Sequence, residues 1–435
     1  MNIRINPVVV LFIIGSLHLF SMWPGILSPD SQGQYAMAIA GVYSDHHPPL
    51  MSFVWRYLDK IVSGPGMMFL LHLGLLYAAI FYLIISVNNF IYKFLLLLFS
   101  LIPQIFFYSN MIWKDVGFTF SFLFIAAYLG YITVNKKQLN WQKDFLKIII
   151  LLIILFYGTA VKFQAQFCAP VLLAWLAYIL ADYKYCNKLF IKYFSILSIL
   201  FYICLNSVNT ILVPNINKNH SWQLVKLYDL AAISISTNQD LFPLFTKNNN
   251  FTMQELKNRL SRKSLDKFSY YMVDDLIFEN AILKSGSNEA ERKQLYFCWL
   301  KTIIKHPVLY IKHRMINMAS MLLYHPSFKY INKYNNNKII IELANIIIYL
   351  TMCNLVPAIL SLIYFILGII AVRKNILTGL PLLCFNLISL IMLAVLFFCS
   401  MAGTPRYTYI VVCMVHASHI FAYLTYNNLK QGLKK

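Results

Sequence analysis

The sequence predicts an all-α polytopic membrane protein with about ten transmembrane helices, and three observations predict this class. First, 59% of the 435 residues are hydrophobic and only 12% are charged, with a mean hydropathy of +0.63. Soluble proteins carry about 25% charged residues. Second, apolar runs of about 18 residues or more recur along the chain. Third, basic residues gather in alternate connections between these runs, as in membrane proteins.

The apolar runs define the predicted spans one by one. The first run is long enough to cross a bilayer and lacks a small-residue cleavage site, so we expect an uncleaved first helix. The fifth run is short, whereas the eighth is long for a single span. The predicted spans are 7–27, 66–88, 93–112, 116–134, 146–161, 164–182, 189–212, 344–371, 376–400 and 407–426.

Charge orients these spans. With the N-terminus in the cytoplasm, alternation places the lysine-rich connections and the C-terminus inside, and the short outer loops then hold fewer basic residues. The net charge of +21 therefore reflects cytoplasmic loops and contact with anionic lipid, and no single basic patch suggests nucleic-acid binding. The predicted cytoplasmic basic residues are Lys93, Lys136, Lys137, Lys143, Lys147, Lys184, Lys188, Lys192, Arg373, Lys374, Lys430, Lys434 and Lys435.

Three parts follow from this topology. Residues 1–212 form an N-terminal transmembrane module, and its first outer loop, about 28–65, begins with an amphipathic helix over 31–42. Residues 213–343 form an extracytoplasmic helical segment, and 344–435 form a C-terminal transmembrane module. The outer segment is rich in Asn and Lys, and we expect helices around 221–236, 253–283 and 288–324, with loops at "KNNN" and "NKYNNNK".

Several kinds of chemistry have no local support. No Walker A loop, GxGxxG, HExxH or CxxC motif is present. Seven of the eight cysteines fall in or beside apolar segments without a close partner, so they indicate small core residues, neither a disulfide framework nor a metal site. The adjacent His46 and His47 are poor joint ligands of one ion, so we expect them to shape the loop or contact a substrate.

Nearly every unusual polar residue lies on the predicted outer side. Ionisable groups at membrane depth are costly and usually functional, although a single one is often an interfacial charge that reaches water. Because so many bracket four outer loops and the outer segment, we expect a shared site. Its expected members are Asp30, Asp45, His47, Lys114, Asp115, Lys162, Gln164, Asp229, Arg314, Arg406 and Tyr407.

These residues divide by charge into two roles. Asp30 follows Pro29 in "SPDS", so its carboxylate is either the N-cap of the 31–42 helix or a general base at the membrane surface. Asp45 has the same ambiguity, as a turn residue or a substrate ligand. The cations either clamp a phosphate, which guanidinium does bidentately, or contact phospholipid headgroups. They are Lys114, Lys162, Arg314 and Arg406.

The order of these motifs resembles the GT-C superfamily of polytopic glycosyltransferases, which use polyprenyl-phosphate-linked sugars on the non-cytoplasmic face. "PGILSPDSQGQYAMAIAGVYSDHHPPL" resembles the family's first outer loop, where an early acidic residue is the catalytic base; that role falls on Asp30. His47 and Pro48 match a related sequence in one bacterial branch, and "IWKDVGF", "YDLAAIS", "HPVLYIKHR" and "GTPRYTY" resemble its later blocks. Two features depart from the family: Lys162 stands where Arg is frequent, and this sequence ends soon after the tenth predicted span, where many relatives carry a larger outer domain.

The resemblance implies an inverting transfer at the outer face of a bacterial cytoplasmic membrane. Asp30 would deprotonate an acceptor hydroxyl, and lysine and arginine side chains would stabilise the departing phosphate. A divalent cation, Mg or Mn, held by Asp115, Asp45 or Asp229 is the alternative for that phosphate, although the sequence does not require it. The expected partners are a lipid-linked sugar donor, a glycan, lipid or protein acceptor, and membrane lipids.

Other functions stay open at this point. A surface-polysaccharide polymerase or ligase uses similar lipid-linked glycans and a long outer loop. A lipid-sugar transporter or flippase without transferase activity would show repeat symmetry or Gly/Pro-broken spans in matching halves, and the sequence indicates neither. A structural membrane subunit without activity would tolerate substitution of Asp30 without any change in glycans.

Overall fold

The computed structural model describes residues 6–184, 187–214, 218, 220–260, 276, 281–323 and 353–432. Within these ranges it forms seventeen α-helices and no strand, only two isolated bridging pairs, which confirms the predicted all-α class.

The N-terminal half contains ten helices, with short 3-10 turns η1 (Phe99–Leu101) and η2 (Phe163–Phe167) between them. They are α1 (Pro7–Met22), α2 (Pro29–Ala40), α3 (Leu50–Asp59), α4 (Gly66–Ile85), α5 (Phe90–Leu97), α6 (Pro103–Ser109), α7 (Lys114–Val134), α8 (Phe145–Ala160), α9 (Ala169–Leu180) and α10 (Lys188–Leu212).

The outer segment and the C-terminal module follow. The outer segment contains α11 (Gln223–Thr237), η4 (Leu244–Thr246), α12 (Met253–Leu260), α14 (Glu289–Lys305) and α15 (Pro307–Leu323). The C-terminal module contains α18 (Leu355–Arg373), α19 (Gly379–Cys399), η5 (Pro405–Thr408) and α20 (Tyr409–Gly432).

Six of the described helices are long and apolar enough to cross a membrane: α4, α7, α10, α18, α19, and α20 together with η5. α1, α8 and α9 are apolar but have only 16, 16 and 12 residues. Each predicted apolar run therefore contains a helix, whereas ten crossings stay a prediction. Residues 344–352 of the eighth predicted span lie outside the described residues.

The predicted span over 93–112 is not one continuous helix. The chain here forms α5 with η1, and then α6, with a bend of 50° between the two. Pro103 explains the break, because proline lacks an N–H and disfavours helical backbone at the preceding residue. Ile102 accordingly has an extended ψ of 124°. Counted as one span, this bent pair would raise the number of crossing helices to seven.

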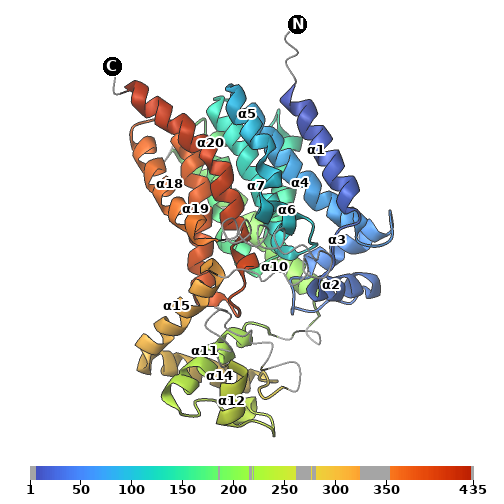
Figure 1. Ribbon diagram of the computed structural model, residues 1–435, viewed down its shortest axis with the longest axis vertical. Coiled ribbons are helices and arrows are strands. Elements are labelled where there is room, and N and C mark those ends of the chain that lie inside the picture. The colour runs from blue at the N-terminus through green and yellow to red at the C-terminus, as the bar shows by residue number, and fades with distance from the viewer. Residues whose placement is uncertain are drawn as a thin grey trace, which may run out of the picture.

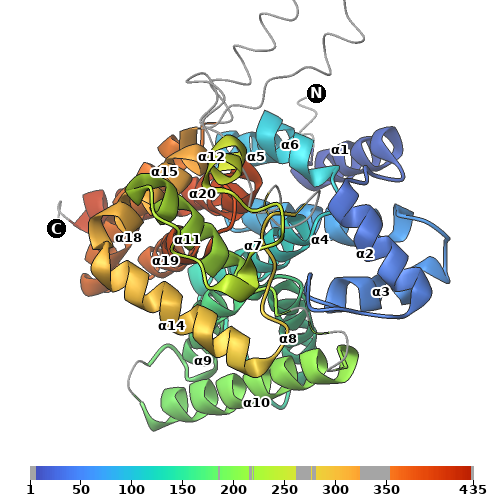
Figure 2. The same ribbon diagram turned by 90° about the horizontal axis from the view of Figure 1, so that it is seen from below.

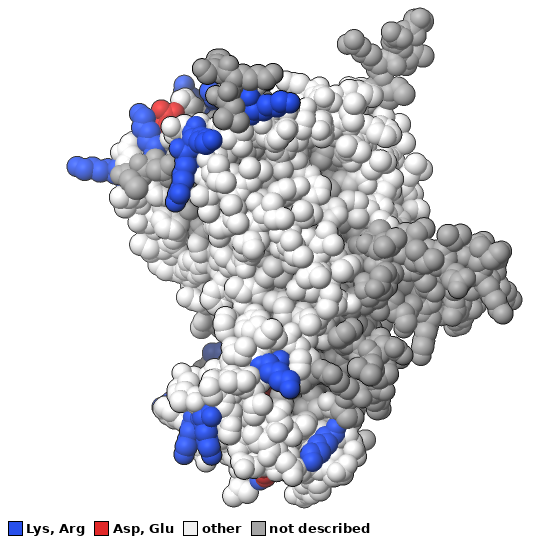
Figure 3. All heavy atoms as spheres, turned by 60° about the vertical axis from the view of Figure 1, so that its left-hand side comes forward, with Lys and Arg blue, Asp and Glu red and all other residues white. Residues whose placement is uncertain are grey.

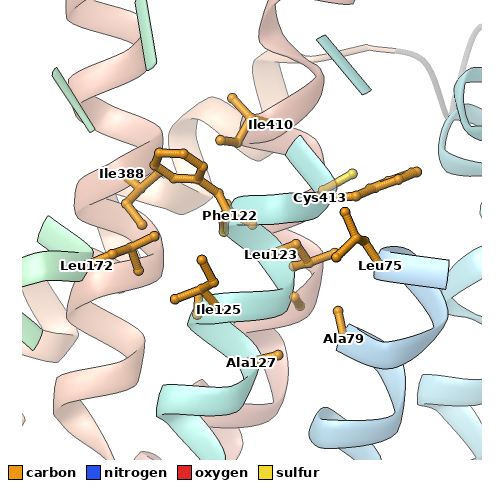
Figure 4. Packing of buried hydrophobic residues seen from close by; sticks show 14 of the residues in the cluster. Leu75, Ala79, Phe122, Leu123, Ile125, Ala127, Leu172, Ile388, Ile410 and Cys413 are labelled. Atoms are coloured by element: carbon orange, nitrogen blue, oxygen red, sulfur yellow. The ribbon is translucent and has the colours of Figure 1, made fainter. Parts of the chain in front are cut away.

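α7 is the centre of the membrane bundle. Its apolar window is 83% buried, compared with 17% for α10, which lies at the edge. Phe122 and Ile125 of α7 point toward Leu172 of α9 and Ile388 of α19, and Leu123 of α7 points toward the opposite side (Figure 4). There it meets Leu75 of α4 and Cys413 of α20.

The two ends of the bundle differ. The start of α1 and the end of α20 lie at the same end, and α11, α12 and α14 lie beyond the other end (Figure 1). Lysines and arginines gather at both ends on the face seen in Figure 3, and the broad band between them carries almost none. Such a band suits the apolar core of a bilayer.

The outer segment has a hydrophobic core of its own. Leu227 of α11, Leu256 of α12 and Leu295 of α14 are fully buried in it. Seen from below, α11 and α14 cover the middle of the bundle's base, with α2 and α3 to one side and α10 along another edge (Figure 2).

The described helices of the outer segment match the predicted ones in part. The helix expected at 221–236 is α11, whereas the one expected at 288–324 is two helices, because Pro307 starts α15 after α14 ends. Most of 253–283 beyond α12, and the "NKYNNNK" loop, lie outside the described residues, and "KNNN" is a loop as expected.

Candidate functional site

Ser28, not Asp30, caps α2. The Ser28 hydroxyl accepts a hydrogen bond from the Ser31 backbone N–H, and the Ser31 hydroxyl accepts one from the Ser28 N–H, both at 3.3 Å. This reciprocal pair is a capping box. The N-cap interpretation of Asp30 was therefore wrong, because Ser28 fills that position. The Asp30 carboxylate is left to interact with other parts of the chain.

Asp30 pairs with Arg406 across the whole sequence. The Arg406 guanidinium donates to Asp30 Oδ2 at 2.6 Å, and the Asp30 side chain keeps 34% of its surface exposed. The guanidinium carbon also lies 5.2 Å from the ring centre of Trp113 and 5.4 Å from that of Tyr407. Trp113 in turn donates its indole N–H to Ser28 Oγ at 2.7 Å. The first outer loop, "WKD" and "GTPRYTY" thus meet at one place.

The charges around Asp30 keep it ionised. Burial raises the pKa of Asp30, but the positive charges of Arg406 and Lys114 outweigh burial, so the pKa lies below its usual value. At neutral pH the group is a carboxylate, which is the form that can accept a proton.

His47 holds Lys114 beside this pair. Its Nδ1 lies 2.7 Å from Lys114 Nζ, so a neutral ring accepts a hydrogen bond from the ammonium. Burial, and then the charge of Lys114, lowers the pKa of His47 to about 3, which keeps the ring neutral. His46 packs against it, with ring centres 4.6 Å apart.

Asp45 connects the first outer loop to the outer segment. Its Oδ2 accepts the backbone N–H of His220 at 3.0 Å, and its backbone oxygen accepts the Ser221 hydroxyl at 3.2 Å. These contacts close the loop over the base of the bundle.

Lys162 and Asp115 form a buried ion pair. Their side chains are only 3% and 4% exposed. Lys162 Nζ also lies 4.8 Å from the ring centre of Tyr407, so Tyr407 lies between two cations, Lys162 and Arg406. Burial lowers the pKa of Lys162, although Asp115 opposes that shift.

A second buried pair joins α11 to α15. Arg314 donates to Asp229 at 2.8 Å, both side chains are fully buried, and Arg314 also donates to the Ser400 carbonyl at 2.8 Å. Asp229 accepts the Trp299 indole N–H at 2.8 Å as well. His313 Nε2 lies 3.3 Å from the same carboxylate. This pair fixes Trp299 and the start of the loop after α19.

A cavity of about 900 Å³ lies between the bundle and the outer segment. Its wall is mostly apolar, with polar groups at a few places, as ligand pockets usually are. The residues lining it from the first 213 positions are Asp45, His46, Pro48, Pro49, Lys114, Lys162, Phe163, Gln164, Gln166, Phe167, Asn206, Asn209, Thr210 and Val213. The remaining lining residues are Lys218, Ser221, Trp222, Val225, Lys226, Trp299, Tyr310, Val395, Phe398, Cys399, Met401 and Tyr407.

The expected site residues fall into three groups. Asp30, His47, Lys114, Asp115, Lys162, Arg406 and Tyr407 form one connected cluster, called the Asp30 cluster below. Asp45 and Gln164 line the cavity, as do Lys114, Lys162 and Tyr407 of that cluster. Asp229 and Arg314 are buried behind the wall, where they hold Trp299, so a direct substrate contact from them stays a prediction.

Four aromatic or basic residues of the site had no predicted role. Trp113 supports Arg406, and Trp222, Lys226 and Trp299 line the cavity from the outer segment. The sequence offered one signal for them: Trp222 and Lys226 are four residues apart, so they share one face of α11.

The carboxylates do not suit a divalent cation. Among the described residues, no three His, Cys, Asp or Glu side chains come close enough to hold a metal ion. Asp30, Asp115 and Asp229 each face a lysine or arginine, and Asp45 accepts a backbone N–H. These four carboxylates are therefore already engaged by contacts within the protein.

Comparison of the chain with protein-family models, with curated proteins and with solved structures finds no match.

Proposed function

We propose that this protein is an inverting membrane glycosyltransferase that moves a sugar from a polyprenyl-phosphate-linked donor to an acceptor at the outer face of the bacterial cytoplasmic membrane. The observation that carries the proposal is the Asp30 carboxylate, which is partly exposed, takes no part in capping, and lies among cations. A carboxylate and several cations in one cluster are the groups required for proton abstraction beside a departing phosphate.

The reaction is a single displacement. The Asp30 carboxylate takes the proton of an acceptor hydroxyl, and the acceptor oxygen forms a bond to the anomeric carbon of the sugar. The bond from that carbon to the phosphate oxygen breaks, and the phosphate leaves with the electron pair. Lys114 and Arg406 stabilise the charge on the phosphate, and the anomeric configuration inverts.

Arg406 has donors to spare for that phosphate. Its Nε and the hydroxyl of Thr404 are buried and have no hydrogen-bond partner among the described residues. A phosphate bound beside Arg406 would accept from Nε and compete with Asp30 for the guanidinium. Because Arg406 lowers the pKa of Asp30, its departure would make the carboxylate a stronger base when the donor is in place.

The cavity also suits a lipid-linked donor. Phe163, Phe167 and Phe398 line it, and each keeps 41 to 52% of its surface exposed. In a bilayer these rings would face lipid near the outer surface, which is where a prenyl tail would remain while its sugar phosphate reaches Lys114.

A transporter is less well supported. Transporters built from repeats place broken helices in corresponding positions of two halves. Over the described residues only one bent pair, α5–η1 with α6, has the length and apolar character of a broken span.

The test is glycan profiling of a deletion strain complemented with wild type, Asp30→Asn or Asp182→Asn. Asp182 is an exposed aspartate outside the Asp30 cluster. Its backbone φ of 55° is also tolerated by Asn, so Asp182→Asn is a matched control. We expect Asp182→Asn to restore the glycan and Asp30→Asn to reduce transfer about 100-fold or more. Full restoration by Asp30→Asn, at equal protein level, would refute the assignment of the base.

A further inference from the structure

The outer wall of the cavity carries one cation held by three aromatic rings. Lys226 Nζ lies 4.2 Å from the ring centre of Trp222, 5.0 Å from that of Trp299 and 5.6 Å from that of Tyr296. Lys226, Trp222 and Trp299 all line the cavity. We refer to these three residues as the outer subsite.

Helix stability does not explain Lys226. It lies in the first turn of α11, where the partial positive charge of the helix N-terminus disfavours a cation. It is also half-buried, whereas lysines usually extend into solvent. Asp229 on the same helix and the three rings offset part of this cost, and the ammonium stays open to the cavity, where it can pair with a negative charge of a ligand.

One ring of the outer subsite, that of Trp299, is held in place before any ligand arrives. Trp299 donates to Asp229, which pairs with Arg314, and all of these contacts are 2.8 Å long. Trp222 keeps 43% of its surface exposed, so a ring face is available to the apolar face of a sugar. Rigid aromatic walls of this kind lower the entropic cost of binding.

The charge of the cavity wall favours an anion. Four lysines line it, Lys114, Lys162, Lys218 and Lys226, against Asp45 as the one acidic residue among the lining residues that the structure describes. Lys162 is neutralised by the buried Asp115. Positive charge therefore remains on Lys114 of the Asp30 cluster and on Lys226 of the outer subsite. These two lysines come from different parts of the chain, α7 and α11.

We propose that the outer subsite binds the acceptor, and that the acceptor is an anionic glycan whose phosphate or carboxylate group pairs with Lys226 while a sugar ring stacks on Trp222. The assignment rests on the proposed function. In a single displacement the acceptor must approach the anomeric carbon from the side opposite the phosphate. If Lys114 and Arg406 hold the donor phosphate at the bundle, the acceptor hydroxyl reaches Asp30 and the rest of the acceptor lies along the wall formed by the outer segment.

The test measures binding by tryptophan fluorescence of the purified full-length protein in detergent. The probes are glucose 6-phosphate, glucuronate and uncharged methyl glucoside. We expect both anionic sugars to bind and methyl glucoside to bind at least about tenfold more weakly, because it lacks the charge-assisted contact. The tighter of the two anionic probes distinguishes a phosphate-bearing from a carboxylate-bearing acceptor.

Four variants assign the binding to a residue. Lys226→Gln should raise the Kd for the anionic probes about tenfold, and Trp222→Ala should raise the Kd of all three. Lys301→Gln and Phe297→Ala remove an exposed lysine and an exposed aromatic residue of α14 that do not line the cavity, and both should bind as wild type does.

Three results would overturn the outer subsite. These are unchanged binding in Lys226→Gln, equal binding of methyl glucoside, or a loss of binding in Arg406→Met that Lys226→Gln does not share. The proposed function is tested separately, by glycan transfer in the Asp30→Asn variant. Asp30→Asn should still bind the anionic probes. If Asp30→Asn keeps both transfer and binding, the assignment of Asp30 as the base is refuted, whereas the outer subsite is not.

Discussion

Replacing Arg314 with methionine should loosen the outer segment without unfolding the membrane bundle. The substitution removes a guanidinium that donates to Asp229 and to the Ser400 carbonyl, each at 2.8 Å. Asp229 would then be a fully buried carboxylate without its directly paired guanidinium; Trp299 and His313 still contact it, and Lys226 interacts with it electrostatically. Burial lowers the pKa of His313, so this histidine does not readily replace the lost charge.

The magnitude follows from the complete burial of both partners. Removing one partner of a buried ion pair typically costs about 3–5 kcal/mol, because the remaining charge is left uncompensated. A loss of 3 kcal/mol is about a 100-fold change in an opening equilibrium. The double variant Asp229→Asn with Arg314→Met removes both charges and should be more stable than Arg314→Met alone.

Amide hydrogen exchange measures this opening helix by helix. In Arg314→Met we expect exchange in α11 and α14 to accelerate about 100-fold or more, while α4 and α7 stay at the wild-type rate. An acceleration below about threefold in α11, or an equal acceleration throughout the bundle, would refute the reasoning that this pair locally anchors the outer segment.

Three further predictions concern the Asp30 cluster and the residues that support it. Lys162→Met leaves Asp115 buried without its cation and should lower the free energy of unfolding by about 3–5 kcal/mol, and the double variant with Asp115→Asn should recover part of that loss in thermal unfolding. His47 has a native pKa of about 3, against an ordinary value of 6.5 that applies to the unfolded chain. The unfolded chain therefore binds an extra proton between these values, and stability falls as the pH falls through that window. His47→Gln keeps an acceptor for Lys114 but does not titrate. Between about pH 7 and about pH 5 its melting temperature should therefore fall less than that of wild type. An equal fall in both proteins would contradict the lowered pKa of His47 in the folded chain. Ser28→Ala removes the cap of α2 and the acceptor of Trp113, so exchange in α2 should accelerate by a factor that corresponds to about 1 kcal/mol, whereas unchanged protection would show that the cap is dispensable.

The sequence predicted the membrane-embedded part of the fold better than the internal geometry of the site. Long apolar runs are recognised from hydropathy along the sequence, and a long apolar run in a membrane protein favours a helix. Each predicted run accordingly contains a helix. The bend at Pro103 and the division at Pro307 were missed, although both depend on a local signal, because hydropathy alone does not register a lost N–H.

The roles of individual polar residues were harder to predict. In "SPDS" both Ser28 and Asp30 are good N-cap residues, and only the geometry of the turn assigns the cap to Ser28. Asp229 and Arg314 are 85 residues apart, so their mutual pairing could not be told from two separate contacts with a substrate. Contacts at such separations depend on how the outer segment folds onto the bundle.

One loop connects the two walls of the cavity. Ser400, which accepts from Arg314, is the first residue after α19, and the same loop continues through Gly403 and Thr404 to Arg406 of the Asp30 cluster. Gly403 allows this loop to lie against α15, because a Cβ added there would be 2.5 Å from the Ser320 Cβ. The buried pair behind Trp299 therefore also fixes the position from which Arg406 reaches Asp30. A change at Arg314 acts on both walls at once, which is why residues far from Asp30 in the sequence can control the geometry of the cluster around it.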